Sequence, residues 1–213
     1  RNPMTAVEDY LQPEGGWRQP VETRLPPPPP SQRGVAFRAI SGVSRLFGRE
    51  ELPRIFPVLN TNRRLFWPWL WFASRLMPFG RLPADLREKL ILRTAWHCRS
   101  RYEWGQHVEI ALSAGVSDAD IVALATGHDD ADPSHAAALR ACDDLCREKL
   151  ISDANWQVLA GHFKPAALVE ITVLVGHYEM VAGLLINSGI DLEPSIDAVL
   201  ADFNRRARDV RLA

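Results

Sequence analysis

The stretch "LPADLREKLILRTAWHCRSRYEWGQHVEIALSAGVSDADI", residues 82–121, decides the fold class. Apolar residues recur in it at helical spacing, as Leu86 and Leu90 do one turn apart, and it shows almost none of the period-two alternation of strands. Pro83 stands ahead of the first predicted turn, and Gly115 ends the second predicted helix. The stretch therefore predicts two consecutive helices.

Helical signals continue along the rest of the chain. The segment after residue 116 predicts a helix capped by Ser117 or Asp118, and a long amphipathic helix follows with Pro133 near its start. A shorter helix is capped by Ser152 or Asp153, and the apolar run 165–187, ended by Gly189, predicts a central helix. The tryptophan-rich segment upstream predicts a helix that starts at Pro68. We predict an all-α domain over residues 35–213.

Residues 1–34 are poor in core-forming side chains, and their five consecutive prolines at 26–30 impose an extended backbone without donors. We predict an extended proline-rich arm there, which either stays mobile or lies along a neighbouring subunit.

The composition excludes several classes of partner. The 25 Lys and Arg residues nearly balance the 26 Asp and Glu residues, so no overall field favours nucleic acid or an anionic membrane. The most apolar run, residues 65–73, is much shorter than the ~20 residues that span a bilayer. Three cysteines in a chain of 213 residues do not suggest a secreted disulfide framework and favour a reducing compartment, so we expect a cytoplasmic protein.

Glu103 and His107 are the first candidates for chemistry. They lie four residues apart, hence on one helical face, where a carboxylate can orient an imidazole or share a proton with it. A purely structural interpretation stays open, because Ser100 and Glu103 also form the S-x-x-E pattern of a capping box. Trp96, Tyr102 and Trp104 lie close by and would wall a pocket from which water is excluded.

The residues "LPADLREKLILRTAW" and "YEWGQHVEIALSAGVSDADI" resemble the carboxymuconolactone decarboxylase family, whose all-helical fold is shared with the alkylhydroperoxidase AhpD proteins. The resemblance extends roughly over residues 46–194. It implies an AhpD-like helical domain, and its most specific patterns are L-R-E-x-x-I-L at 86–92 and Y-E-W-x-x-H at 102–107.

The family that this chain resembles has two branches with different chemistry. The peroxidase-like branch carries a Cys-x-x-Cys pair, whose positions are Ser100 and Glu103 in this chain, so its dithiol route is not implied. The decarboxylase-like branch has a glutamate four residues before the histidine, as Glu103 and His107 stand here. That branch moves protons on lactones and carboxylates without a metal or an organic cofactor. Glu88 matches a further glutamate of the family, one helix earlier.

We therefore expect a lyase- or isomerase-type enzyme acting on a small-molecule substrate. His107, oriented by Glu103, would move a proton next to a carbonyl or at a lactone oxygen, with Glu88 as the second proton-transfer group. Arg93 or Arg101 would hold a substrate carboxylate, unless each forms an ordinary ion pair at the surface or at a subunit interface.

Several alternatives stay open beside this enzyme. Cys98 would serve an antioxidant protein of the alkylhydroperoxidase type if its thiol were reactive, and a non-catalytic ligand-binding oligomer would need no chemistry at all. His177 is either a pocket residue or a hydrogen-bonded core histidine. The loop "GHDDADPSH" at 127–135 has no recognised ligand spacing, so we expect no metal site there. The tryptophans at 67–71 suggest a homo-oligomer.

Overall fold

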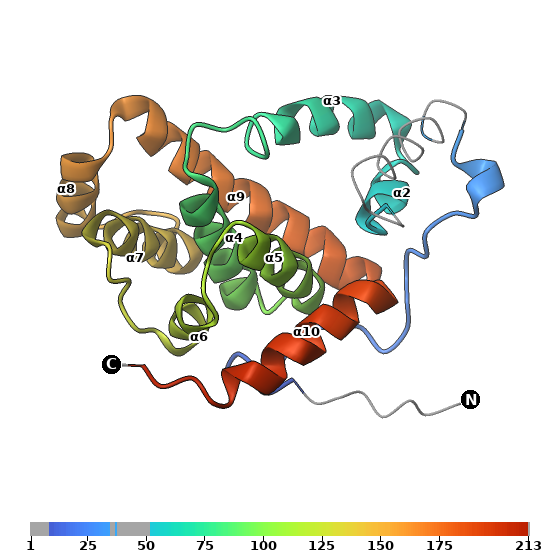
Figure 1. The fold of residues 1–213 in the computed structure, drawn as a ribbon. Coiled ribbons are helices and arrows are strands. Elements are labelled where there is room, and N and C mark those ends of the chain that lie inside the picture. The colour runs from blue at the N-terminus through green and yellow to red at the C-terminus, as the bar shows by residue number, and fades with distance from the viewer. Residues whose placement is uncertain (1–8, 35–36, 38–51, 213) are drawn as a thin grey trace.

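The computed structural model describes residues 9–34, 37 and 52–212, and within them every regular element is helical, as the sequence predicts. No strand occurs among these residues. Figure 1 shows the arrangement, whose elements are η1 (Pro30–Gln32), α2 (Ile55–Leu59), α3 (Arg63–Ser74), α4 (Ala84–Cys98), α5 (Arg101–Ser113), α6 (Asp118–Thr126), α7 (Pro133–Glu148), α8 (Asp153–His162), α9 (Pro165–Ser188) and α10 (Pro194–Ala207).

Local capping signals set most of the helix ends. Ser117 caps α6 in a capping box with Asp120, and Ser152 caps α8 by accepting from the Asn155 amide. Helix α9 ends at Gly189, whose φ of +65° lies in the left-handed region that glycine adopts without strain. These predicted ends are confirmed.

The predicted start of the tryptophan-rich helix at Pro68 is wrong. Helix α3 begins five residues earlier, at Arg63, and contains Pro68 in its interior. The Asn62 side chain accepts a hydrogen bond from the Leu65 amide at 3.3 Å and so supplies the N-terminal cap. Pro68 removes one backbone donor from the second turn but does not end the helix. The start of α3 is set by the Asn62 cap, which lies before the apolar run.

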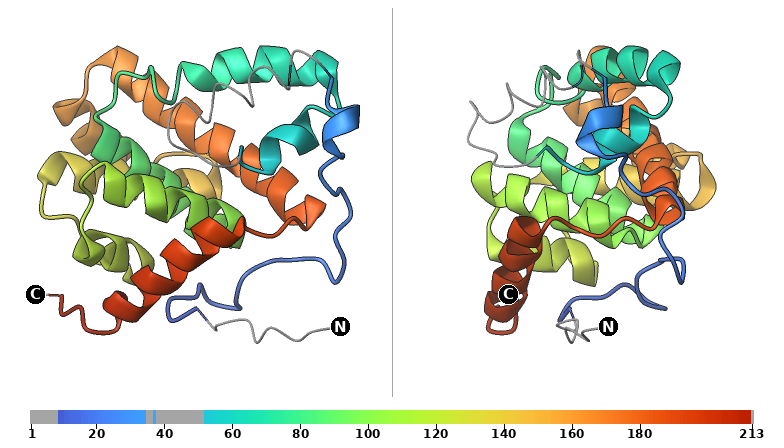
Figure 2. Two further views of the ribbon diagram at one scale, coloured as in Figure 1. Left: turned by 45° about the vertical axis from the view of Figure 1, so that its right-hand side comes forward. Right: turned by 90° about the vertical axis from the view of Figure 1, so that its right-hand side faces the viewer.

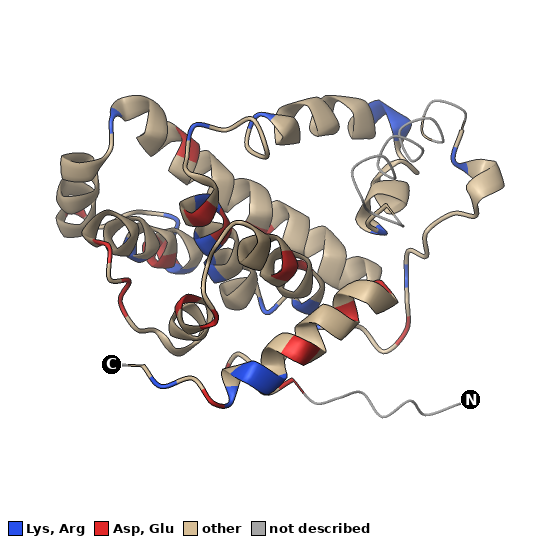
Figure 3. Cartoon of the chain, viewed as in Figure 1, with Lys and Arg blue, Asp and Glu red and all other residues tan. Residues whose placement is uncertain are grey.

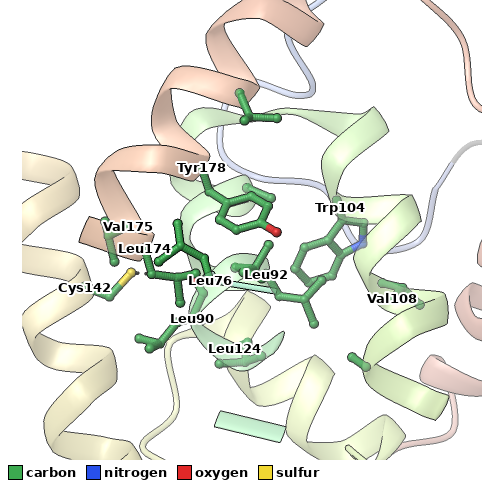
Figure 4. Close-up of a cluster of buried hydrophobic side chains, with 14 of the residues drawn as sticks. Leu76, Leu90, Leu92, Trp104, Val108, Leu124, Cys142, Leu174, Val175 and Tyr178 are labelled. Carbon is green, nitrogen blue, oxygen red and sulfur yellow. Dashed lines mark hydrogen bonds between the residues drawn. The ribbon is translucent and has the colours of Figure 1, made fainter. Parts of the chain in front are cut away.

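Helix α4 is the centre of the domain, since it packs against α5, α7, α9 and α6. Its residues Leu90, Ile91 and Leu92 are fully buried, and so is the charged Glu88, so this helix is enclosed on nearly all sides. Figure 4 shows part of the core, a cluster to which α4 contributes Leu90 and Leu92, α9 contributes Leu174 and Tyr178, and α5 contributes Trp104.

The described part of the proline-rich arm packs along its own chain. The Trp17 ring meets Trp96 edge-on, with ring centroids 5.5 Å apart, and the Arg24 amide donates to the Ser188 carbonyl at 2.8 Å. The two views of Figure 2 show the arm passing beside the domain. The predicted boundary after residue 34 adjoins residues 35–36 and 38–51, which lie outside the described part.

By length and composition one described helix, α9, is apolar enough to cross a membrane. It is also the helix that packs against α4, α7, α5 and α8. This packing, and the polar His177 and Tyr178 buried on it, are features of a core helix.

Candidate functional site

A cavity of about 330 Å³ lies between α2, α3, α5 and α9. Its volume suits a small organic molecule. It is mostly apolar, with walls that include Ile55 and Phe56 from α2, Trp69 and Leu70 from α3, and Val181 from α9. Its polar lining consists of Ser74, Tyr102, Glu103, Gln106, His107, His177 and Tyr178.

Helix periodicity explains which residues reach this cavity. Glu103, Gln106, His107 and Ile110 follow one another at spacings of three, one and three residues, which places them on one face of α5. Gln106 was missed from the sequence, although the same spacing would have grouped it with Glu103 and His107. Trp69 was also missed, because nothing local distinguishes it from the other tryptophans of α3.

The Glu103 carboxyl group is buried in this cavity wall without a partner. Its residue is 2% exposed, and neither carboxyl oxygen has a hydrogen-bond partner. Burial raises the pKa of Glu103 well above its ordinary value, because desolvation favours the neutral acid over the carboxylate. The predicted capping box is wrong, because Ser100 begins α5 without a side-chain cap bond and its hydroxyl is likewise unpartnered.

His107 is oriented by Glu88 rather than by Glu103, which corrects the predicted pairing. The His107 Nδ1 and Glu88 Oε2 atoms lie 2.7 Å apart, and the Arg87 Nε donates to Glu88 Oε1 at 3.0 Å. Burial alone would raise the pKa of Glu88, but His107 and Arg87 together lower it below its ordinary value. The ionised Glu88 accepts from Nδ1–H, so Nε2 is the ring nitrogen of His107 that this contact leaves available.

The two carboxyl groups around His107 therefore differ in state. Glu88 is fully buried but charged, since it is paired on both oxygens, whereas Glu103 is buried, unpaired and neutral. A charged carboxylate that fixes an imidazole and a neutral acid nearby are the two states that acid/base chemistry requires.

His177 lies on the cavity wall, in a row of aromatic rings. Its imidazole stacks on Trp69, with ring centroids 6.0 Å apart and an interplanar angle of 19°. Burial lowers the pKa of His177 to about 4, so the ring is neutral at neutral pH. Its Nδ1 atom is buried and has no hydrogen-bond partner. Of the two interpretations left open by the sequence, the pocket position is the observed one.

Glu193 fixes two further polar side chains of the lining. The Tyr102 hydroxyl donates to Glu193 Oε1 at 2.8 Å, and Gln106 Nε2 donates to Oε2 of the same carboxylate. The Arg54 amide donates to Glu193 as well, at 2.6 Å. Tyr102 therefore contributes to the wall as predicted. Its hydroxyl is bound by Glu193, whose role was not predicted from the sequence.

Four residues predicted to bind substrate lie outside the cavity lining. Trp96 and Trp104 pack against each other at a centroid distance of 4.9 Å and receive Trp17 from the arm, so they serve the core and the arm contact. Arg93 donates to both oxygens of Asp143 at 2.6 and 2.8 Å, which is the ion-pair alternative. Arg101 is engaged in the same way by Asp9.

Cys98 does not have the features of a reactive thiol. It is absent from the cavity lining, and burial, with a smaller contribution from Glu103, raises its pKa to about 12. Redox-active cysteines instead have a lowered pKa. The three cysteines are all free thiols.

The loop at 127–135 is organised by helix capping and an ion pair. Asp132 accepts from the Ser134 and His135 amides at the start of α7, and Asp130 pairs with Lys89 at 2.6 Å. The described residues contain no group of three or more His, Cys, Asp or Glu side chains placed to hold a metal ion.

Residues 64–144 match the model of the carboxymuconolactone decarboxylase family. This part of the chain is similar to that family. The matched residues contain α4 and α5, and hence Glu88, Glu103 and His107, whereas α9 with His177 lies beyond them. The matched segment therefore supplies part of the cavity wall, and α2 and α9, which lie outside it, supply the rest.

Solved structures share the fold of this chain. A variant of the debrominase Bmp8 in complex with 2,3,4-tribromopyrrole matches with a TM-score of 0.72 at 15% identity, covering 86% of this chain and 98% of that one. An alkylhydroperoxidase AhpD core protein, an uncharacterized peroxidase-related protein from Ralstonia eutropha JMP134, matches with a TM-score of 0.70 at 18% identity, covering 82% and 94%. An uncharacterized peroxidase-related protein from Silicibacter sp. TM1040 gives 0.71 at 14% identity, covering 85% and 98%.

These identities are low, so the likeness establishes the AhpD-like fold and not the reaction. No curated protein sequence matches the chain.

Proposed function

We propose that this protein is an enzyme that transfers protons on a small molecule bound in the cavity between α2, α3, α5 and α9. The observation that carries the proposal is the buried, unpartnered carboxyl group of Glu103 on the same helix face as His107, which Glu88 fixes at 2.7 Å. An unsatisfied buried polar group costs about 1–3 kcal/mol, so its presence favours a role in binding or chemistry.

In this proposal His107 is the base and Glu103 the acid. The Nε2 lone pair of His107 removes a proton from a carbon next to a carbonyl, while the neutral Glu103 donates its proton to, or hydrogen-bonds, the carbonyl oxygen on which charge develops. Glu88 acts as a positioning residue that stabilises the imidazolium. This differs from the role expected for Glu88 as a second proton-transfer group. Isomerisation of a lactone-type substrate through its enol uses such steps.

The size of the cavity supports a small substrate. The structure of Bmp8 with 2,3,4-tribromopyrrole gives a precedent in this fold for a small ring as ligand. The proton-transfer steps proposed for this chain use only the side chains of His107, Glu103 and Glu88.

Proton transfer can be tested before a natural substrate is known. We expect the protein to catalyse exchange of carbon-bound hydrogen for deuterium in one or more members of a panel of small lactones and cyclic ketones in D₂O, measured by proton NMR. The variant His107→Gln should lower the exchange rate by about 10²–10⁴-fold, because it removes the base. His162→Gln, on the exposed end of α8, is the matched control and should leave the rate unchanged. Binding of panel members without any exchange would instead favour the non-catalytic alternative.

We also propose that the protein self-associates through α3 and α9. Trp71 is 66% exposed on α3, and Val169 and Met180 are 64% and 49% exposed on α9. Figure 3 shows that neither helix has more than a few charged residues along it. Exposed apolar faces of this kind mark contacts between subunits.

Light scattering coupled to chromatography is therefore expected to give a multiple of the 23.9 kDa chain mass. Met180→Lys should reduce that mass, whereas Gln157→Lys, exposed on α8, should leave it unchanged. A wild-type mass equal to one chain would contradict self-association.

A further inference from the structure

We propose that the cavity selects an uncharged, flat ring that carries a hydrogen-bond acceptor and donor, that it rejects carboxylates, and that His177 is one of the residues that set this choice. The inference deepens the proposed function by naming the ligand class, but it concerns binding and does not require that proton transfer occurs.

The first support is the charge of the lining, which includes no lysine or arginine among the residues that the structure describes. The nearest basic side chains are engaged elsewhere. Arg87 is paired with Glu88, and Arg54 donates to the Asp191 and Leu192 carbonyl groups. A carboxylate entering the cavity would therefore lose its hydration without gaining an arginine or lysine partner, and Glu88 already compensates any charge on His107.

The second support is the shape and chemistry of the walls. Phe56 and Trp69 meet at a centroid distance of 5.9 Å, the His177 ring stacks on Trp69, and Tyr178 meets both His177 and His107 edge-on. Rings arranged in this way present both faces and edges to a cavity, and they pack best against another flat ring. The volume of about 330 Å³ admits a molecule of that kind.

The third support is that buried polar groups of the same wall have no partner. The Glu103 carboxyl group lies on α5, the Nδ1 atom of His177 on α9 and the Trp69 indole N–H on α3, each without a hydrogen-bond partner. Burial favours the uncharged forms of Glu103 and His177, so an uncharged ligand satisfies them without leaving a net charge in the apolar space. A ring with a carbonyl and an N–H group, such as an aromatic amide or a lactam, has the matching acceptor and donor.

A matched pair of probes tests the inference. Benzamide and benzoate have nearly the same shape and differ in charge. At pH 7.5, titrations followed by NMR of the full chain are expected to show benzamide binding at least about tenfold more tightly than benzoate, because only benzoate must be desolvated as an anion. The preference should shrink as the pH falls and benzoate becomes protonated.

Two variants assign the preference to this cavity. His177→Phe keeps a ring on Trp69 but removes Nδ1, and it is expected to weaken benzamide binding about fivefold. Ser74→Arg places a cation in the lining and should shift the preference toward benzoate. Thermal unfolding of each variant checks that it is folded.

Equal binding of the two probes to the wild-type chain, or failure of benzamide to bind, would overturn the inference. A preference that Ser74→Arg leaves unchanged in a folded protein would overturn it too. A wild-type protein that prefers benzamide but catalyses no deuterium exchange would refute the catalytic proposal alone. Failure of the catalytic proposal can therefore be distinguished from failure of the binding inference.

Discussion

Replacement of Glu103 by leucine is expected to make the protein more stable while it abolishes proton transfer. The wild-type carboxyl group is buried with both oxygens unpartnered, so folding removes it from water without compensation. Leucine has a similar volume and carries no polar atom. We expect the free energy of unfolding to rise by about 1–3 kcal/mol, measured by urea denaturation, and deuterium exchange to fall by at least about 10²-fold.

The gain in stability should increase with pH. Because the pKa of Glu103 is raised in the folded protein, the folded chain retains a proton that the unfolded chain releases above the ordinary glutamate pKa. The wild-type protein therefore loses stability as the pH rises through the range between these two pKa values, and Glu103→Leu does not.

An exposed glutamate gives the matched control. Glu148 lies exposed at the end of α7, and Glu148→Leu should change the stability by no more than about 0.5 kcal/mol at any pH. A Glu103→Leu variant that is less stable than the wild type and still catalyses exchange would show that the carboxyl group is a structural element of α5.

Replacement of Glu88 is expected to have the opposite effect on stability. This carboxylate is fully buried between His107 and Arg87, so Glu88→Ala leaves a buried guanidinium without its partner. Breaking a buried pair from one side costs about 3–5 kcal/mol. We expect a loss of that size in urea denaturation, together with lost exchange activity, because the imidazole is no longer oriented. Glu88→Gln keeps the shape and should lose less stability.

The pH dependence of this effect follows from the lowered pKa of Glu88. A carboxylate with a lowered folded pKa contributes its stability above the ordinary glutamate pKa, and this contribution is lost as the pH falls toward the folded value. The free energy of unfolding of the wild-type chain should therefore decline on acidification more steeply than that of Glu88→Gln.

A second group of an arginine, a carboxylate and a histidine lies outside the cavity. It provides a control that distinguishes an effect on stability from an effect on exchange. Asp143 accepts from Arg93 at 2.6 Å and contacts His97 at 2.7 Å, so an arginine, a carboxylate and a histidine meet there as they do around Glu88. Asp143→Asn should lower stability but leave exchange unchanged. If Glu88→Gln and Asp143→Asn reduced exchange equally, the loss would come from the fold and not from His107.

The helices themselves could be predicted because their signals are local. Ser117, Ser152 and Gly189 act within one turn of the residues that they cap, so the sequence near each end contains the information. The failure at Pro68 has the same explanation: the deciding cap was Asn62, outside the apolar run from which the start was inferred.

The site could be predicted only in part. Glu103 and His107 are four residues apart on one helix, and this spacing by itself determined that they share a face of α5. Spacing does not report burial or the neighbour across a helix contact, and both decided the chemistry. Packing of α4 against α5 gave His107 its partner Glu88 and left Glu103 neutral, while α3 and α9 closed the cavity with Trp69 and His177.

The sequence by itself thus determined an all-helical chain and the helix that carries the acid and the imidazole, since backbone capping and side-chain periodicity act over a few residues. Only the tertiary structure decided which carboxylate is charged, which histidine is paired and which arginines are already engaged. Those properties depend on desolvation and on contacts between residues distant in the chain, as in the 2.7 Å contact between Glu88 and His107.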